Sequence, residues 1–156
     1  MKLFVEWGRL IVLKDATKDD MIFKLDLSKV PTSAGVYMFG RQWGRKFEAL
    51  YVGKGGNVRG RVHSHLNNLR LMHYLRNART GKRVLLAGRI KTRQGQRQAK
   101  CLLLAERTLL RHFLSEGHKL VNKQGTRISR HELTSSGAHP KRFFPKSIFV
   151  EKTNGE

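Results

Sequence analysis

The sequence contains very little cysteine. Cys101 is the single cysteine among 156 residues, which excludes an internal disulfide and any multi-cysteine zinc site. Three leucines follow it directly, so we expect a buried thiol that packs as a small hydrophobic group. This cysteine usage favours an intracellular protein, either cytoplasmic or associated with the nucleoid.

Negative charge is also scarce. Eleven Asp and Glu are set against 32 Lys and Arg, giving a formal net charge of +21 at pH 7 and a pI of about 11.2. Such a field attracts polyanions, of which phosphate backbones are the first candidates. An acidic membrane surface is the competing partner, but no long amphipathic basic helix or lipidation signal is present. We therefore expect DNA, with RNA as the alternative, as the partner and no membrane.

Long hydrophobic runs are missing as well. The uninterrupted apolar runs span only a few residues each, which excludes a transmembrane helix. Glu6 and Arg9 interrupt the apolar residues at the N-terminus, so a signal-peptide pattern is not expected there. The length and the lack of internal repeats predict a single domain, 1–156, with a modest core.

The stretch from residue 35 to residue 65 predicts a β-hairpin followed by a helix. Residues 35–40 and 49–53 are rich in β-branched and aromatic side chains, and Gly44 falls in the turn between them. Apolar residues then recur at helical spacing from residue 58 onward. Asn57 stands just before that helix, where it is a suitable N-cap.

Four polar side chains occur on these elements. Tyr37 and Tyr51 lie on the two predicted strands, while Arg61 and His65, four residues apart, share one face of the helix. Each residue alone is compatible with a half-buried strand tyrosine or a solvated cation. Their combination within one hairpin and one helix points to more than packing.

Further strands are predicted on both sides of this stretch. Residues 3–13 favour a strand, or a hairpin that turns at Gly8, and residues 21–27 alternate apolar and polar side chains. Residues 84–90 form the short apolar run that is typical of a buried strand. Residues 147–150 are expected to add an edge strand.

Two more helices are predicted between residues 69 and 115. Residues 69–82 and 98–115 carry apolar side chains at helical spacing, and the loop 92–98 between them either contacts a polynucleotide or is simply solvated. Glu106 lies on the apolar face of the second helix. Residues 49–105 contain thirteen Lys and Arg but no acid, so Glu106 is a lone carboxylate among cations, and a structural salt bridge is one explanation for it.

The C-terminal region is polar and basic. Residues 135–137, Ser-Ser-Gly, predict a loop. Residues 140–146 interleave cations with aromatic side chains, which is compatible with a nucleic-acid surface. Phe143 and Phe144 can instead cap the hydrophobic core, and the sequence leaves both alternatives open.

The triplets Gly35-Val36-Tyr37 and Tyr51-Val52-Gly53 resemble the signature of the GIY-YIG nuclease superfamily, with valine replacing isoleucine in both. Family members carry a lysine just after the second triplet, and Lys54 is there. They carry an arginine ten residues beyond its tyrosine and a histidine or tyrosine four residues later. Arg61 and His65 stand at these two positions.

The resemblance continues toward the C-terminus. A glutamate on a later helix of the family fits Glu106, and an asparagine after that helix fits Asn122, although the family usually places it nearer to the glutamate. The matched region runs from about residue 31 to about residue 123 and would be the nuclease core. Residues 1–30 are then an N-terminal strand extension and residues 124–156 a basic C-terminal extension.

The resemblance implies a small α/β (α+β) domain with a central mixed or antiparallel sheet flanked by helices. It implies a metal-dependent endonuclease that hydrolyses phosphodiester bonds in DNA, with a water nucleophile activated through Tyr37 or His65. Arg61 would neutralise charge on the phosphate in the transition state. Glu106 would hold Mg²⁺ (or Mn²⁺), for which one carboxylate suffices if substrate phosphate supplies another ligand. No small-molecule cofactor is expected.

Four more residues complete the expected site. Tyr51 and Lys54 would position the phosphate or base, Asn122 would orient nearby groups, and Arg59 is a further candidate for substrate binding. The alternatives are a non-catalytic basic nucleic-acid-binding protein and an RNase. The charge suits a pure binding protein equally well, but the lone carboxylate of Glu106 would weaken its affinity.

Overall fold

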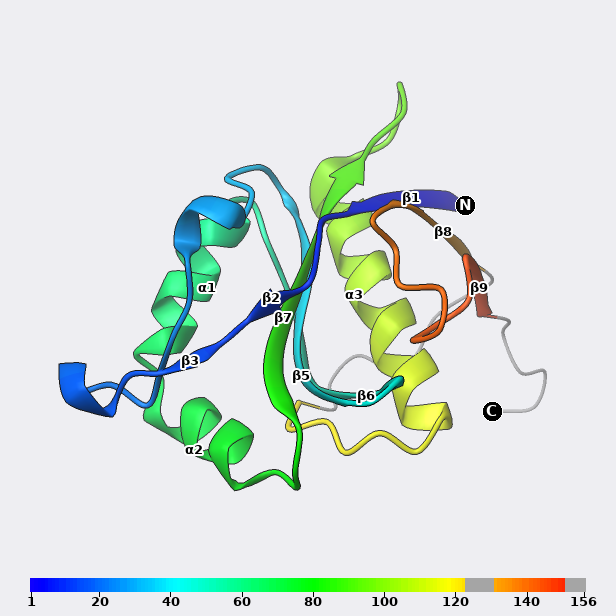
Figure 1. The fold of residues 1–156 in the computed structure, drawn as a ribbon. Coiled ribbons are helices and arrows are strands. Elements are labelled where there is room, and N and C mark those ends of the chain that lie inside the picture. Colours follow the sequence, from blue (N-terminus) through cyan, green and yellow to red (C-terminus); the bar gives the residue numbers. More distant parts are fainter. Residues whose placement is uncertain (123–130, 151–156) are drawn as a thin grey trace.

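In the computed structural model, which describes residues 1–122 and 131–150, the chain forms an α+β fold around a curled, mostly antiparallel sheet (Figure 1). The strand order is β6-β5-β7-β1-β8-β9, and β2 also pairs with β7. Only the β1–β8 pair is parallel among the described pairings. The strands are β1 (Lys2–Trp7), β2 (Ile11–Val12), β5 (Gly35–Trp43), β6 (Lys46–Gly55), β7 (Lys82–Lys91), β8 (His131–Gly137) and β9 (Ser147–Val150).

Helices cover both faces of this sheet (Figure 1), so the expected architecture of a mixed sheet flanked by helices is confirmed. Helices α1 (Val58–Leu66) and α2 (Leu69–Asn77) lie on one face, and α3 (Gln98–Ser115) lies on the other. No helix within 1–122 and 131–150 combines the length and the apolar character needed to cross a membrane.

Four short elements lie between β2 and β5. Strands β3 (Lys14–Asp15) and β4 (Phe23–Lys24) form a separate two-stranded ribbon. The 3-10 turns η1 (Thr17–Asp19) and η2 (Leu27–Lys29) complete this segment.

The β5–β6 hairpin and α1 form where the sequence predicts them. Gly44 occupies the turn with φ of +57°, a left-handed conformation that favours glycine. The side chain of Asn57 caps α1 by accepting a hydrogen bond from the backbone N–H of Gly60 at 3.1 Å. Hairpin and helix therefore follow each other without a long loop, which places α1 directly on the sheet.

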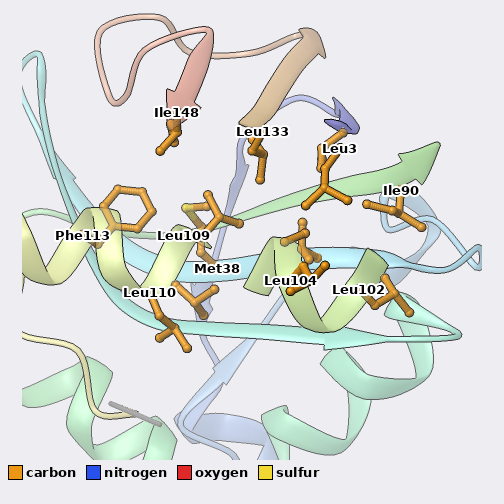
Figure 2. Close-up of a cluster of buried hydrophobic side chains, with 14 of the residues drawn as sticks. Leu3, Met38, Ile90, Leu102, Leu104, Leu109, Leu110, Phe113, Leu133 and Ile148 are labelled. Carbon is orange, nitrogen blue, oxygen red and sulfur yellow. The ribbon is translucent and has the colours of Figure 1, made fainter. Parts of the chain in front are cut away.

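The larger core lies between the sheet and α3 (Figure 2). The helix has the predicted bounds and turns its apolar stripe, including Leu109 and Phe113, onto Met38 of β5. Leu133 and Ile148, from β8 and β9, close the other side of this cluster. Cys101 is buried here, as its leucine-rich surroundings predict.

A second core lies between the sheet and the α1–α2 pair. Phe39 and Leu85 from the strands meet Met72 and Leu75 from α2. This core also contains the buried hydroxyl of Tyr37.

The N-terminal segment does not form the alternative hairpin at Gly8. Strands β1 and β2 both pair with β7, with Val5 opposite Ile90 and Ile11 opposite Leu85. Because the backbone N–H of Gly8 donates to the Ala87 carbonyl at 2.9 Å, the chain continues along β7 instead of turning back. Of the strand expected over residues 21–27, only the two residues of β4 are present.

The loop expected at residues 135–137 is wrong. These residues belong to β8, which pairs in parallel with β1. The Ser135 hydroxyl accepts a hydrogen bond from the Trp7 indole N–H at 3.0 Å, so a small polar residue satisfies a buried donor inside the sheet. Phe144 packs edge-on against Trp7, which makes it part of the core. Phe143 stacks on Phe47 with centroids 4.4 Å apart and also packs against the core.

Candidate active site

Three aromatic side chains from three elements form a compact group, which we call the tyrosine–histidine cluster. Tyr37 comes from β5, Tyr51 from β6 and His65 from α1. The Tyr37 hydroxyl lies 2.7 Å from Nε2 of His65. The Tyr51 ring stacks on Tyr37 with centroids 6.3 Å apart and meets His65 edge-on at 4.9 Å. Residues that are 28 positions apart in the chain thus share one hydrogen bond.

Two glycines of β6 make room for this arrangement. Tyr37 lies opposite Gly53 in the hairpin register. A Cβ atom at Gly53 would lie 2.5 Å from the Tyr37 hydroxyl, so any side chain there would displace the tyrosine. A Cβ at Gly55 would lie 2.5 Å from Cγ of Arg61. The glycines after Tyr51 are therefore required by the packing of Tyr37 and Arg61.

Burial sets the protonation states in the cluster. Tyr37 is 0% exposed and His65 is 8% exposed. Burial raises the pKa of Tyr37 well above its ordinary value, so the phenol keeps its proton. Burial, followed by the positive charge of Arg61, lowers the pKa of His65 to about 4. A neutral imidazole at pH 7 can accept the proton of the Tyr37 hydroxyl.

Tyr51 is the more accessible of the two tyrosines. It is only partly buried, whereas Tyr37 is inaccessible to solvent. Burial raises the pKa of Tyr51, and the positive charge of Arg61 is the main influence that opposes this rise. The Tyr51 ring contacts both Tyr37 and His65, so it links the outside of the site to the buried pair.

Arg61 is the cation common to the whole site. Its side chain is exposed on α1, and its charge lowers the pKa values of Tyr37, Tyr51 and His65. The same charge also lowers the pKa of Glu106. An exposed guanidinium next to these groups is suited to bind two oxygens of a phosphate.

Glu106 reaches the site from α3, on the opposite face of the sheet. Its Oε2 atom lies 3.8 Å from Nζ of Lys54, which is longer than the 2.7–2.9 Å typical of a charge-assisted hydrogen bond. Burial raises the pKa of Glu106, while the charges of Lys54, Arg107 and Arg61 lower it. The carboxylate also raises the pKa of Tyr51, so the two groups interact around the edge strand β6.

The donor set at Glu106 fits a hard, hydrated cation. The site offers one half-buried carboxylate, and within 1–122 and 131–150 no group of three or more His, Cys, Asp or Glu side chains gathers around a point. Mg²⁺ often uses one or two carboxylates and keeps several waters, with substrate phosphate as a further ligand. A cation at Glu106 would compete with Lys54, whose Nζ lies 3.8 Å from the carboxylate.

Asn122 does not point at the cluster. Its side-chain oxygen accepts from the Val52 N–H at 3.2 Å, and its amide group donates to the Val52 carbonyl. Val121 N–H donates to the Leu50 carbonyl at 2.8 Å, and Nδ1 of His118 accepts from Ala49 N–H. The segment after α3 thereby pairs with the outer edge of β6, the strand that carries Tyr51. The side-chain amide of Asn122 forms the two hydrogen bonds to Val52 that a neighbouring strand would form. The sequence did not predict this role.

Arg59 is also set apart from the other expected site residues. Its guanidinium donates to the backbone carbonyls of Val30, at 2.8 Å, and Ser28, at 3.3 Å. Residues two positions apart on a helix point to different sides, so Arg59 and Arg61 lie on either side of α1. Arg59 ties the N-terminal segment to α1.

Phe39 is a component of the site that the sequence did not single out. Its ring lies against both Tyr51 and His65, with centroid distances of 6.3 and 6.2 Å. Its place two residues after Tyr37, on the same face of β5, was the available signal.

Comparison of the chain with family models, curated proteins and solved structures finds no match.

Proposed function

We propose that the chain is a metal-dependent endonuclease of the GIY-YIG type that hydrolyses phosphodiester bonds in DNA. The observation that carries the proposal is the 2.7 Å hydrogen bond between the Tyr37 hydroxyl and Nε2 of His65, with Arg61 beside it. Residues matched to the family signature on β5, β6, α1 and α3 interact at one edge of the sheet. A basic protein that only binds has no need of a buried proton acceptor paired with a tyrosine.

The accessible Tyr51 hydroxyl is the group that meets the attacking water. Tyr51 takes a proton from the water as the new phosphorus–oxygen bond forms, and passes its own proton to Tyr37. Tyr37 passes its proton to Nε2 of the neutral His65. The raised pKa values keep both phenols protonated at pH 7. The relay is compatible with this state, because each tyrosine gives up one proton as it receives another and no free phenolate is needed.

Arg61 and Glu106 compensate the negative charge of the phosphate, Arg61 directly and Glu106 through a bound cation. The exposed guanidinium of Arg61 binds two non-bridging oxygens and stabilises the charge that builds up in the transition state. Glu106 would hold Mg²⁺, which when bound supplies a Lewis acid for the phosphate. Lys54 lies beside Glu106 and can move onto a phosphate oxygen when the cation takes the carboxylate.

A non-catalytic nucleic-acid-binding protein is the second candidate. The loose ion pair between Lys54 and Glu106 favours it, because a carboxylate already facing a lysine needs no metal. The net charge of +21 suits both candidates. The two functions are therefore distinguished by whether Glu106 binds a metal ion or serves only as the partner of Lys54.

The decisive experiment combines substrate, metal and one substitution. Plasmid, single-stranded DNA and RNA are incubated with the protein in Mg²⁺ or in EDTA, and cleavage and binding are measured on the same preparations. We expect DNA cleavage in Mg²⁺ only. Glu106→Gln should lower the cleavage rate at least about a hundredfold and leave binding equal or tighter, since one negative charge is removed. Glu116→Gln, the same change at the exposed end of α3, should be without effect.

Four results would redirect the proposal. Full activity in Glu106→Gln would reject the metal-ligand role. Loss of the folded state in Glu106→Gln, seen as an early melting transition, would show a structural partner of Lys54. If the wild type cleaves no nucleic acid in any metal, the non-catalytic binding function is the one that stands. Cleavage of RNA alone would identify an RNase.

A further inference from the structure

A separate pocket of about 420 Å³ lies on the other side of α1 from the tyrosine–histidine cluster. Residues 28–32, the connection between β1 and β2, and the end of β7 enclose it. None of the cluster residues lines it, and neither do Arg61 or Glu106. Its walls come from residues 1–32 together with β7, α1 and Gly137 at the end of β8, so it depends on the N-terminal segment and not on the hairpin.

Four cations surround this pocket: Arg9, Lys29, Arg59 and Arg89. Arg89 projects from the central strand β7 and is exposed, as is Arg9. Arg59 is held by its hydrogen bonds to the Val30 and Ser28 carbonyls. Because its guanidinium is already held by backbone carbonyls, Arg59 loses little side-chain freedom when an anion binds nearby.

The single carboxylate in the lining is already neutralised. Glu6 lies opposite Arg89 in the β1–β7 register, but its Oε2 is 3.1 Å from Nζ of Lys91. Within 1–122 and 131–150, no salt bridge engages Arg9 or Arg89. Both arginines thus line the pocket without a salt bridge among the described residues.

The lining combines these charged side chains with the buried apolar residues Ile11, Val30 and Ala87. Its volume lies in the range of small-ligand sites. We propose that this pocket binds a phosphorylated ligand of mononucleotide size, with the phosphate on Arg89 and Arg9. The shared chemistry is a phosphate monoester on an organic body, either as a free nucleotide or as the 5′-phosphorylated end of a strand.

Calorimetric titration with dAMP, in low salt and EDTA, tests the proposal without any cleavage. We expect one site for dAMP and at least tenfold weaker binding of deoxyadenosine, which lacks the phosphate. Arg89→Gln should weaken dAMP about tenfold, as the loss of a charge-assisted hydrogen bond implies. Arg70→Gln removes the same charge from the exposed face of α2 and should change little. Arg9→Gln is a second pocket variant in case Arg89→Gln does not fold.

Each other outcome is decisive. If dAMP binds equally weakly to the Arg70 and Arg89 variants, the overall positive charge of the protein accounts for binding, and the pocket site is overturned. Absence of dAMP binding to the wild type also overturns it. Loss of dAMP binding in Arg61→Gln, with the Arg89 variant unaffected, would place the ligand at the cluster and also overturn it. Competition by a 5′-phosphorylated oligonucleotide would identify a strand end as the source, whereas its failure would identify a free nucleotide. These titrations are independent of the proposed cleavage.

Discussion

The two faces of the sheet are built by the same strands but enclose different chemistry. Along β5, Val36 and Met38 point to the α3 side, where the buried cluster consists of hydrophobic side chains. Tyr37 and Phe39 point to the α1–α2 side, where Tyr37 meets the imidazole of His65. Strand alternation thus divides one hairpin between a hydrocarbon core and a polar site.

This difference shows how the fold separates stability from chemistry. The core on the α3 side consists mostly of hydrocarbon side chains, and its buried Trp7 indole N–H is satisfied by the Ser135 hydroxyl, so this side stabilises the sheet. That support allows the other face to bury a phenol and an imidazole, whose pKa values are shifted because water is excluded. Substitutions in the hydrophobic core under α3 and in the tyrosine–histidine cluster should therefore have separable effects.

The largest effect is expected from the α3 side. Phe113→Ala removes a fully buried ring from the core and should lower the free energy of unfolding by about 3–5 kcal/mol. At a temperature where the variant is still folded, its cleavage rate should equal that of the wild type. Chemical denaturation and a cleavage assay measure the two quantities. A folded Phe113→Ala protein that has lost cleavage would mean that the two faces are not independent.

On the other face, Arg61→Lys should affect cleavage and not stability. The side chain is exposed, and an ammonium keeps the charge but cannot bind two phosphate oxygens as a fork. We expect the cleavage rate to fall about ten- to a thousandfold with nearly unchanged DNA affinity. Arg70→Lys, on the exposed face of α2, is the matched control. An unchanged rate in Arg61→Lys would remove the arginine from the mechanism.

Tyr37→Phe tests the buried relay with a smaller change. The substitution keeps the ring but leaves Nε2 of His65 without its partner at 2.7 Å, which should cost about 1–3 kcal/mol of stability. Cleavage should fall about ten- to a hundredfold, because Tyr51 then has no route to His65. Tyr74→Phe also loses a hydroxyl that donates to a backbone carbonyl, that of Lys119, and should cleave normally. Wild-type cleavage by Tyr37→Phe would show that the proton takes another path.

Much of the fold follows from local patterns in the sequence. The bounds of α3 agree with its hydrophobic period, and the β5–β6 hairpin and α1 lie where glycine, alternation and an Asn cap predict them. The pattern fails where pairing partners are distant. Residues 135–137 look like a loop, yet they pair with β1, more than a hundred positions away. No local signal specifies that contact.

The site is predictable to a similar degree. The spacing of Arg61 and His65 places them on one helix, but only the register Tyr37 opposite Gly53 explains why both tyrosines reach them. Neither the exclusion of solvent from Tyr37 nor the use of Asn122 as a strand partner for Val52 can be derived from residue type. Both depend on the three-dimensional arrangement around β6.

The smallest expected effect concerns the pH dependence of His65. Its pKa is about 4 when folded and near 6.5 when unfolded, so the unfolded chain binds more protons between these values. Stability should therefore decrease as the pH falls from about 6.5 to 4, by on the order of 1 kcal/mol from this residue. Burial lowers the pKa values of other histidines in the same direction, so the measurement must be a difference between variants. Those residues are His112, His118 and His139.

Denaturation curves from pH 7 to pH 4 should lose part of this slope in His65→Gln and keep it in His63→Gln, an exposed position on the same helix. The wild-type cleavage rate should show no acid limb from His65 until about pH 4, because the imidazole stays neutral and able to accept a proton above that value. A limb near pH 6.5 that disappears in His65→Gln would mean that water reaches the imidazole. The α1–α2 side would then be an open site and not the dry counterpart of the α3 core.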